Sequence, residues 1–224
     1  MFLNLNPYLE FRMYSVFFKR FAWLMCLMFW AHTAVADPIP ADQFVKNYTE
    51  DLLETIAKNK QLLAGDQKKV AELVDTKILP AVNFQRMTAL VVGRYWRQAT
   101  PEQKERLIEE FRGLLTRTYS GALAQVKDLK IEVKPLRGAA DENDVVVKTL
   151  IIRPKGEPIQ LDYRLERSGD SWKIFDVNVA GLWLVETYKT QFASEISKSG
   201  IDGLISSLSD KAKVADKSND KPKN

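Results

Sequence analysis

The sequence predicts an α+β domain in which helices come first and an antiparallel sheet follows. From Asp42 to Val126, apolar residues recur at the three-to-four-residue spacing of amphipathic helices. From Leu129 to Val179 they alternate with polar residues, which is typical of strands with one buried face. Helices followed by strands with short turns favour a four-stranded antiparallel twisted sheet, covered on one face by several helices.

Residues 1–36 are predicted to be a cleaved signal peptide. Basic residues precede the apolar run Phe21–Trp30, and Ala34-Val35-Ala36 supplies the small-x-small cleavage pattern. The run is shorter than the ~20 apolar residues that a membrane span needs. Met13 is an alternative start. Cys26 lacks the small residues expected before a lipidated cysteine, so no lipid anchor is expected.

Charge and composition exclude several classes of function. The chain has 33 Lys and Arg against 29 Asp and Glu, and the leader removes mostly basic residues, so the remaining chain is nearly neutral. A neutral chain argues against nucleic acid as a partner. The only cysteine (Cys26) and the only histidine (His32) also lie in the leader. This excludes histidine and cysteine catalysis, ordinary zinc sites and disulfides from the rest.

The first two helices have recognisable starts and stops. Asp42 is expected to cap a helix that runs through Val45 to Ile56, and Gly65 and Asp66 separate it from a second helix that ends before Pro80. Both are expected to be amphipathic helices that face the core.

The segment from Val82 to Trp96 is rich in large apolar residues for a short helix. It is either core or the wall of a pocket, and Met87 favours the pocket because a flexible thioether suits a variable apolar ligand. Thr100 and Gln103 then form a capping box with Pro101 at the first helical position. The long helix that follows is expected to pack across the sheet.

Four strands are predicted after Leu129: Leu129–Val133, Asp144–Arg153, Ile159–Glu166 and Trp172–Val179. Short turns between them make a meander the simplest topology. Ile159, Leu161, Tyr163 and Leu165 are expected to face inward, while Gln160, Asp162, Arg164 and Glu166 mark a solvent face.

The last strand is expected to turn into a helix at Gly181, with Leu182, Val185, Tyr188 and Phe192 at helical spacing. A sheet face and a helix face joined this closely must enclose a shared apolar space. The single domain is predicted to span 37–209, and the lysine-rich residues 210–224 a disordered tail.

No motif in the sequence supports catalysis. There is no GxSxG sequence, no P-loop and no metal-spaced set of acids. Asp176 is the best candidate for a buried acid, and an acid at a strand-to-helix junction more often caps the helix or binds backbone amides. We therefore expect no catalytic residues, no metal and no enzyme activity.

Two stretches resemble the MlaC or toluene-tolerance family. The first is GRYWRQATPEQ at residues 93–103, with Phe111 and Tyr119 after it; the second is the carboxy-terminal pattern of Trp172–Val177, Gly181, Leu184-Val185, Tyr188, Gln191-Phe192 and Gly200–Ile205. The similarity runs from about Asp42 to Leu208. Trp183 stands where a small residue is usual, so it is expected to alter the shape of the pocket.

This resemblance implies an NTF2-like fold that encloses an apolar cavity, and a periplasmic phospholipid carrier that maintains outer-membrane lipid asymmetry. Such carriers exchange lipid with an inner-membrane ABC transporter complex (MlaFEDB-like) and an outer-membrane lipoprotein complex (MlaA-like with a porin). Phospholipid is the cargo and no cofactor is implied. We expect a monomer.

Inward residues of both walls are the candidates for lipid contact, although any one of them could be plain core. They are Phe84, Met87, Val91, Phe111, Leu115, Tyr119 and Leu123 on helices, and Val147, Ile151, Leu161, Tyr163, Phe175, Val177 and Val179 on strands. Arg94, Arg97 and Lys189 are candidates for contact with a lipid head group or an acidic partner; the simpler alternative is exposed helix charge.

Two further hypotheses stay open. A hydrolase or isomerase could use the same apolar cavity, because related α+β folds host enzymes. An envelope adaptor without a ligand would instead have the space behind the corner filled by side chains.

Overall fold

The computed structural model describes residues 39–123, 128–136 and 142–219. The chain divides into two units, Met1–Asp37 and Pro38–Asn224, and the first lies outside the described residues, as does the expected signal peptide.

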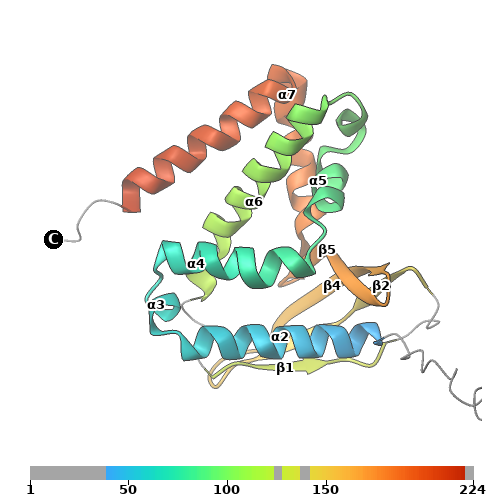
Figure 1. The fold of residues 1–224 in the computed structure, drawn as a ribbon, viewed down its shortest axis with the longest axis vertical. Helices are drawn as coiled ribbons and strands as arrows, with labels where there is room; N and C mark the ends of the chain where they lie inside the picture. The colour runs from blue at the N-terminus through green and yellow to red at the C-terminus, as the bar shows by residue number, and fades with distance from the viewer. Residues whose placement is uncertain (1–38, 124–127, 137–141, 220–224) are drawn as a thin grey trace, which may run out of the picture. The chain divides into compact units, whose positions relative to one another are not determined.

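The helices of the first half begin and end mostly where the sequence predicts (Figure 1). Asp66 caps α4 by accepting hydrogen bonds from the backbone N–H groups of Lys68 and Lys69, and the Thr100–Gln103 capping box is confirmed at the start of α6. The first helix instead begins at Ala41 without a side-chain cap. The helical segments are α2 (Ala41–Lys58), α3 (Lys60–Leu63), α4 (Gln67–Leu73), a π-helical turn η2 (Val74–Ile78), η3 (Leu79–Ala81), α5 (Phe84–Val92), η4 (Gly93–Arg97) and α6 (Pro101–Leu123).

The described strands form an antiparallel sheet of six, so the predicted fold class is confirmed and the strand number is higher than the four expected. The strands are β1 (Lys130–Val133), β2 (Asp144–Val147), β3 (Thr149–Ile152), β4 (Ile159–Ser168), β5 (Ser171–Val179) and β6 (Leu182–Trp183).

The predicted run Asp144–Arg153 is interrupted at Lys148, so β2 and β3 pair with different halves of β4. At the break, the backbone N–H of Thr149 donates to Oδ1 of Asp162 over 2.9 Å instead of to a strand carbonyl. A side chain from the neighbouring strand therefore replaces one bond of the ladder.

The predicted corner at Gly181 is a tight hairpin rather than a direct change from strand to helix. Val179 pairs with Leu182, and the two residues between them, Ala180 and Gly181, have φ angles of 50° and 92°. Positive φ at both central residues is the requirement of a type I′ turn. The short strand β6 then leads into α7 (Leu184–Asn219).

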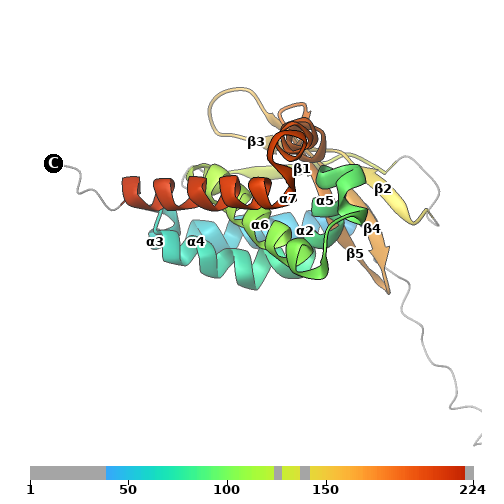
Figure 2. The same ribbon diagram turned by 90° about the horizontal axis from the view of Figure 1, so that it is seen from above.

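Helix α7 bends at Gly200, whose φ of 74° and ψ of −178° are not helical. Figures 1 and 2 both show its second half turning away from the first. A Cβ on Gly203 would lie 2.2 Å from Oγ of Ser199, so this corner also needs a residue without a side chain. Residues 210–219, expected to be a disordered tail, continue the helix, and 220–224 lie outside the described residues.

The described residues form three clusters of buried apolar side chains. The largest joins α5, α6 and both halves of α7, and the second joins α2 to the sheet. A third joins the ends of α2, α3 and α4. Helix α6 thus packs mainly on α5 and α7, and it is α2, not α6 as expected, that lies across the sheet.

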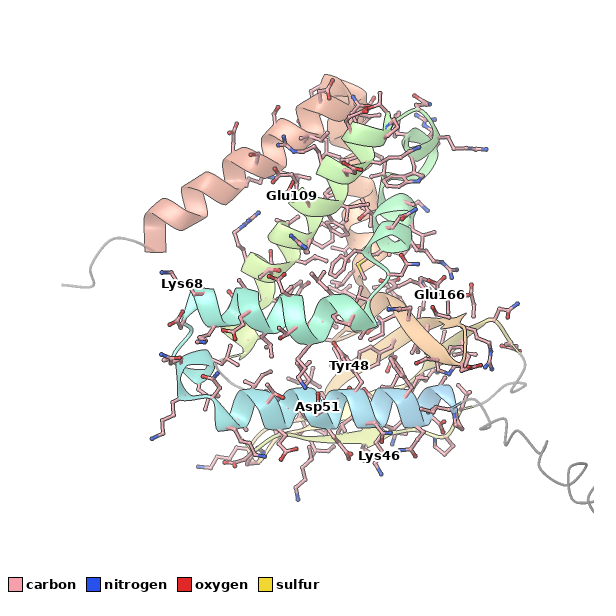
Figure 3. The ribbon with its side chains drawn as sticks, viewed as in Figure 1. Lys46, Tyr48, Asp51, Lys68, Glu109 and Glu166 are labelled. Carbon is pink, nitrogen blue, oxygen red and sulfur yellow. The ribbon has the colours of Figure 1, made fainter. Side chains whose placement is uncertain are left out.

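An ion pair holds α2 to the helices above it. Nζ of Lys77 in η2 lies 2.7 Å from Oδ2 of Asp51, which projects from α2 toward α4 in Figure 3, while Lys46 points the opposite way. Both partners are partly exposed, so the pair contributes only a fraction of a kcal/mol, about 0.2–1. The pair matters because it ties down η2, which borders an apolar cavity.

Candidate functional site

An apolar cavity of about 260 Å³ lies between the sheet and the helices. Three sheet residues, Leu161, Val177 and Val179, form one wall. They share a face because Leu161 pairs with Val179, and Tyr163 with Val177, in the β4–β5 register. The helical lining comes from α4 to α6 and the start of α7: Val70, Val74, Ile78, Val82, Phe84, Met87, Leu115, Thr116, Tyr119, Ser120 and Leu184.

Half of the predicted lining residues meet at this cavity. These are Phe84, Met87, Leu115, Tyr119, Leu161, Val177 and Val179. The α6 pair Leu115 and Tyr119 follows i, i+4 spacing, which places both on the same helix face. Burial raises the pKa of the Tyr119 hydroxyl, and the adjacent Tyr188 raises it further.

Other predicted lining residues belong to solid core in this structure. Phe111 packs edge-on against Tyr188 and Phe192, at ring distances of 5.2 and 5.3 Å. Val91 is in the same cluster, while Val147 and Tyr163 lie in the cluster beneath α2. Ile151 is buried on β3. The side chain of Leu123 lies outside the described part of the chain.

Phe175 is also set apart from the cavity, because β5 has a bulge there. The register of β4 and β5 shifts between Arg164 and Leu165, which leaves Phe175 unpaired. Its ring lies beneath the guanidinium of Arg86, with 3.7 Å from Cζ to the ring centroid.

Arg86 fastens the start of α5 to the sheet. Its guanidinium donates to both carboxylate oxygens of Asp144 and also to Glu166, which itself accepts from the side chain of Asn83. The hydrogen bonds from Arg86 hold the pKa of Asp144 below its ordinary value. This cluster fixes the helix that carries Phe84 and Met87 into the cavity.

Sequence reasoning missed several lining residues. Val70, Val74 and Ile78 were expected only as core, and Leu184 only as part of the last helix; Val82 belongs to the segment that was expected to be either core or a pocket wall, and it does line the cavity. Thr116 and Ser120 were not singled out at all. Their i, i+4 spacing beside Leu115 and Tyr119 is the signal that could have found them, because it places two hydroxyls next to an apolar stripe.

The predicted role of Asp176 as a cap is confirmed. Its Oδ1 accepts hydrogen bonds from the backbone N–H of Val185, at the start of α7, and of Val177. Its Oδ2 accepts from Arg164 over 2.9 Å, and the Arg164 guanidinium stacks on the Trp183 ring at 4.1 Å. Trp183 therefore contacts Arg164 and is not among the cavity-lining residues.

The sheet face that carries Asp176 is less exposed than the sequence suggests. Asp162 is 3% exposed and Asp176 0%, although alternation placed Asp162 on a solvent face. Their oxygens are hydrogen-bonded, so burial is compatible with polar side chains. Burial raises the pKa of Asp176 despite these hydrogen bonds and the nearby Arg164.

The three predicted basic contacts lie outside the cavity lining. Arg94 and Lys189 line a surface groove of about 540 Å³ between the end of α5, η4 and α7, together with Val91, Val92, Gly93, Tyr95, Ala193, Ser194 and Ser197. Among the residues that the structure describes, this groove and the cavity share no lining residue. Arg97 is exposed in η4, beyond the described lining of that groove.

The described ranges contain no cluster of three His, Cys, Asp or Glu residues that could hold a metal ion. Among the helices described, none combines the length and the apolar character needed to cross a membrane.

Comparison with known proteins gives consistent matches. The sequence model of the MlaC protein family matches residues 46–210. The chain is 26% identical over 183 residues to the "Intermembrane phospholipid transport system binding protein MlaC" of Haemophilus influenzae, covering 80% of this chain and 85% of that protein. It is 27% identical over 194 residues to the "Toluene tolerance protein ttg2D" of Pseudomonas putida, covering 84% and 89%.

A solved structure is also similar to this fold. It is the structure of a phospholipid-binding protein from Ralstonia solanacearum in complex with a phospholipid. The TM-score is 0.76 at 46% sequence identity, and the match covers 79% of this chain and 99% of the other.

Proposed function

This chain belongs to the MlaC family, and from that premise we propose that it is a periplasmic carrier of phospholipid between two membranes. The observation that carries the proposal is the apolar cavity between β4–β5 and the helices, lined almost wholly by hydrocarbon side chains. The relatives named for phospholipid transport and phospholipid binding support it.

The physical requirement for such a carrier is to keep acyl chains out of water. Exposing about thirty methylenes would cost roughly 20 kcal/mol or more, at ~0.8 kcal/mol per CH₂. Transfer from a membrane to an apolar cavity can nevertheless be nearly neutral, because both environments are apolar. Volume, apolar lining and a mouth are sufficient, without reactive groups.

The cavity must widen to accept a phospholipid. Its 260 Å³ falls below the roughly 300–1,000 Å³ typical of sites for drug-sized ligands, and a phospholipid is larger than those. The elements around it can separate: α5 is tied to the sheet through the partly exposed Arg86 cluster, and η2 to α2 through Lys77 and Asp51. We propose that lipid loading spreads these helices away from β5.

The lipid-contact proposal concerns the residues already at the cavity and the core residues behind them. Phe84, Met87, Leu115, Tyr119, Leu161, Val177 and Val179 would contact the chains directly. Val91, Phe111, Val147, Ile151, Tyr163 and Phe175 would contact lipid only if the cavity extended into the packed clusters.

The groove at Arg94 and Lys189 suits a different partner. Because it shares no lining residue with the cavity, we assign it, with Arg97, to an acidic surface of a membrane complex. The inner-membrane ABC transporter complex and the outer-membrane lipoprotein complex are the candidates. Charge reversal at Arg94 and Lys189 should leave bound lipid in place and slow its delivery to membranes that carry these complexes.

In the decisive experiment, the chain lacking residues 1–36 is purified, any bound lipid is extracted from it, and the lipid is identified by mass spectrometry. The expected result is co-purified phospholipid, chemically intact, at a fixed ratio to protein. Purified protein that carries no lipid and takes up none from vesicles would contradict the proposal. Hydrolysed or altered lipid would instead favour the enzyme hypothesis.

A further inference from the structure

Arg117 of α6 carries a buried guanidinium nitrogen, Nη2. It is removed from solvent and makes no hydrogen bond within the described residues. The described ion pairs do not include Arg117 either. Leaving a buried donor unpaired is unfavourable, and more so on a charged group.

Other arginines near the cavity do have acidic partners. Arg86 binds Asp144 and Glu166, and Arg164 binds Asp176. Along α6, the helical neighbours of Arg117 at three and four residues' distance are Gly113, Leu114, Ser120 and Gly121, and none carries a charge. Its own helix therefore offers Arg117 no acid.

Arg117 is not itself a lining residue of the cavity, but it lies beside two residues that are. It directly follows Thr116 and lies about one turn before Ser120, and both of these line the cavity with aliphatic hydroxyl groups. Ser120 also donates through its hydroxyl to the carbonyl oxygen of Arg117. The hydrophilic part of an otherwise apolar lining is thus the stretch of α6 that carries Arg117.

A glycine makes room for the guanidinium. A Cβ built on Gly113 would lie 2.9 Å from Nη1 and 3.3 Å from Nη2 of Arg117, so the group rests in space that any side chain at residue 113 would occupy. Glycine inside a helix costs about 1 kcal/mol relative to alanine. Gly113 therefore makes the helix less stable than alanine would, and its missing side chain leaves room for the guanidinium of Arg117.

We propose that Arg117 binds the phosphate of the lipid whose acyl chains enter the cavity, with Thr116 and Ser120 as additional donors. This inference rests on the proposed function. A guanidinium can donate two parallel hydrogen bonds to a phosphate, which fits a phosphate-bearing lipid better than a neutral one. The buried nitrogen then gains the partner that it lacks among the described residues.

The test compares two lipids with identical acyl chains, phosphatidic acid and diacylglycerol, which differ only in the phosphate. Binding to each is measured at equilibrium with the chain lacking residues 1–36. The unsubstituted protein should bind phosphatidic acid about tenfold to a hundredfold more tightly, the range for hydrogen bonds to a charged group. Arg117→Met should remove most of this ratio and leave diacylglycerol binding unchanged.

Gly113→Ala provides a second variant that does not endanger folding. The added methyl group displaces the guanidinium while favouring the helix, so thermal stability should rise and the phosphate preference should fall. Gly121→Ala is the matched control in the same helix, because a Cβ there meets nothing within 4 Å. It should keep the full preference. Arg106→Met, three turns earlier, controls for the loss of one positive charge.

The outcomes separate this inference from the function on which it rests. An unchanged phosphate preference in Arg117→Met and Gly113→Ala, with lipid still bound, would overturn the role of Arg117 alone. Failure of the unsubstituted protein to bind either lipid would overturn both. If inorganic phosphate alone raises the melting temperature of the unsubstituted protein but not of Arg117→Met, Arg117 belongs to a free-anion site and the lipid assignment is wrong.

Discussion

The backbone N–H of Val185 donates to the carboxylate of Asp176 over 3.0 Å, joining the first turn of α7 to the last long strand of the sheet. The same carboxylate holds Arg164 through its other oxygen. The carboxylate of Asp176 on β5 therefore fixes the first turn of α7 and also pairs with the positive charge of Arg164 on β4. Asp176 is a positioning residue for the cavity wall that Leu184 and Val177 complete.

Asp176→Asn should lower the free energy of unfolding by about 2 kcal/mol, because the amide can still accept from Val185 but leaves Arg164 without a counter-charge. Chemical denaturation measures the change. Asp75→Asn, at an exposed position, is the matched control and should shift stability by less than about 0.5 kcal/mol.

The pH dependence of Asp176 has an unusual sign. Its pKa is raised above the ordinary 3.8, so between 3.8 and the raised value the folded chain binds the proton more readily than the unfolded chain. Stability from this group therefore falls as pH rises through that window. The Asp176→Asn variant should lack this slope; an identical pH profile in both proteins would contradict the assignment.

Tyr163→Phe tests the contact between α2 and the sheet. The hydroxyls of Tyr163 and Thr49 share a buried hydrogen bond of 3.3 Å, so its loss should cost about 1 kcal/mol at neutral pH. Burial raises the pKa of Tyr163 from 10.0 to about 12. Between these values the folded state keeps the proton that the unfolded state releases, so stability falls as pH rises from 10 to 12.

The phenylalanine variant has no such proton, and its disadvantage should therefore shrink across that alkaline window. Urea denaturation of both proteins at several pH values gives the comparison. A difference that stays constant from pH 8 to 12 would show that Tyr163 does not titrate as described.

Ala180→Asn should stabilise the hairpin by about 0.5–1 kcal/mol. Ala180 has a φ of 50°, which is unfavourable for alanine, whereas Asn-Gly is the preferred pair of a type I′ turn. Gly181→Ala should act in the opposite direction by about 1–2 kcal/mol, because φ there is 92°. Melting temperatures that do not separate the two variants would rule out this turn.

Val177→Phe should fill part of the cavity and reduce lipid that co-purifies with the protein, without loss of the fold. Space beside Val177 limits the strain of the larger side chain, so stability should change by less than about 1.5 kcal/mol. Val146→Phe is the control, since Val146 is 43% exposed on β2. Equal lipid content in the two variants would argue that the chains bind elsewhere.

Local sequence signals predicted the parts of the fold that depend on near neighbours. Caps at Asp66 and Thr100 and the strand around Leu161 rest on residues within a few positions of one another, so the sequence displays their chemistry directly. Asp176 was also correctly read as a cap. Its partner Val185 is nine residues away, but the sequence predicted a change from strand to helix between the two residues.

Features that depend on distant residues were not predictable. The break between β2 and β3 needs Asp162 to bind the backbone of Thr149, thirteen residues earlier, and nothing in the local pattern reveals this. The alternation of apolar and polar residues placed Asp162 on the solvent face, because that pattern does not show its hydrogen bond to a distant residue. The packing of α6 on α7 rather than on the sheet follows from the bend at Gly200, which returns apolar residues to α6.

The bend at Gly200 also governs the order in which the chain can fold. The core around Phe111 includes Leu204, Ile205 and Leu208, so it cannot close until the chain as far as residue 208 is available to fold. The buried residues of the cluster under α2 end at Ile174, so this cluster can form earlier. Until then the apolar stripe of α6 lacks its cover and is open to aggregation, so successful folding should depend on how that stripe is shielded.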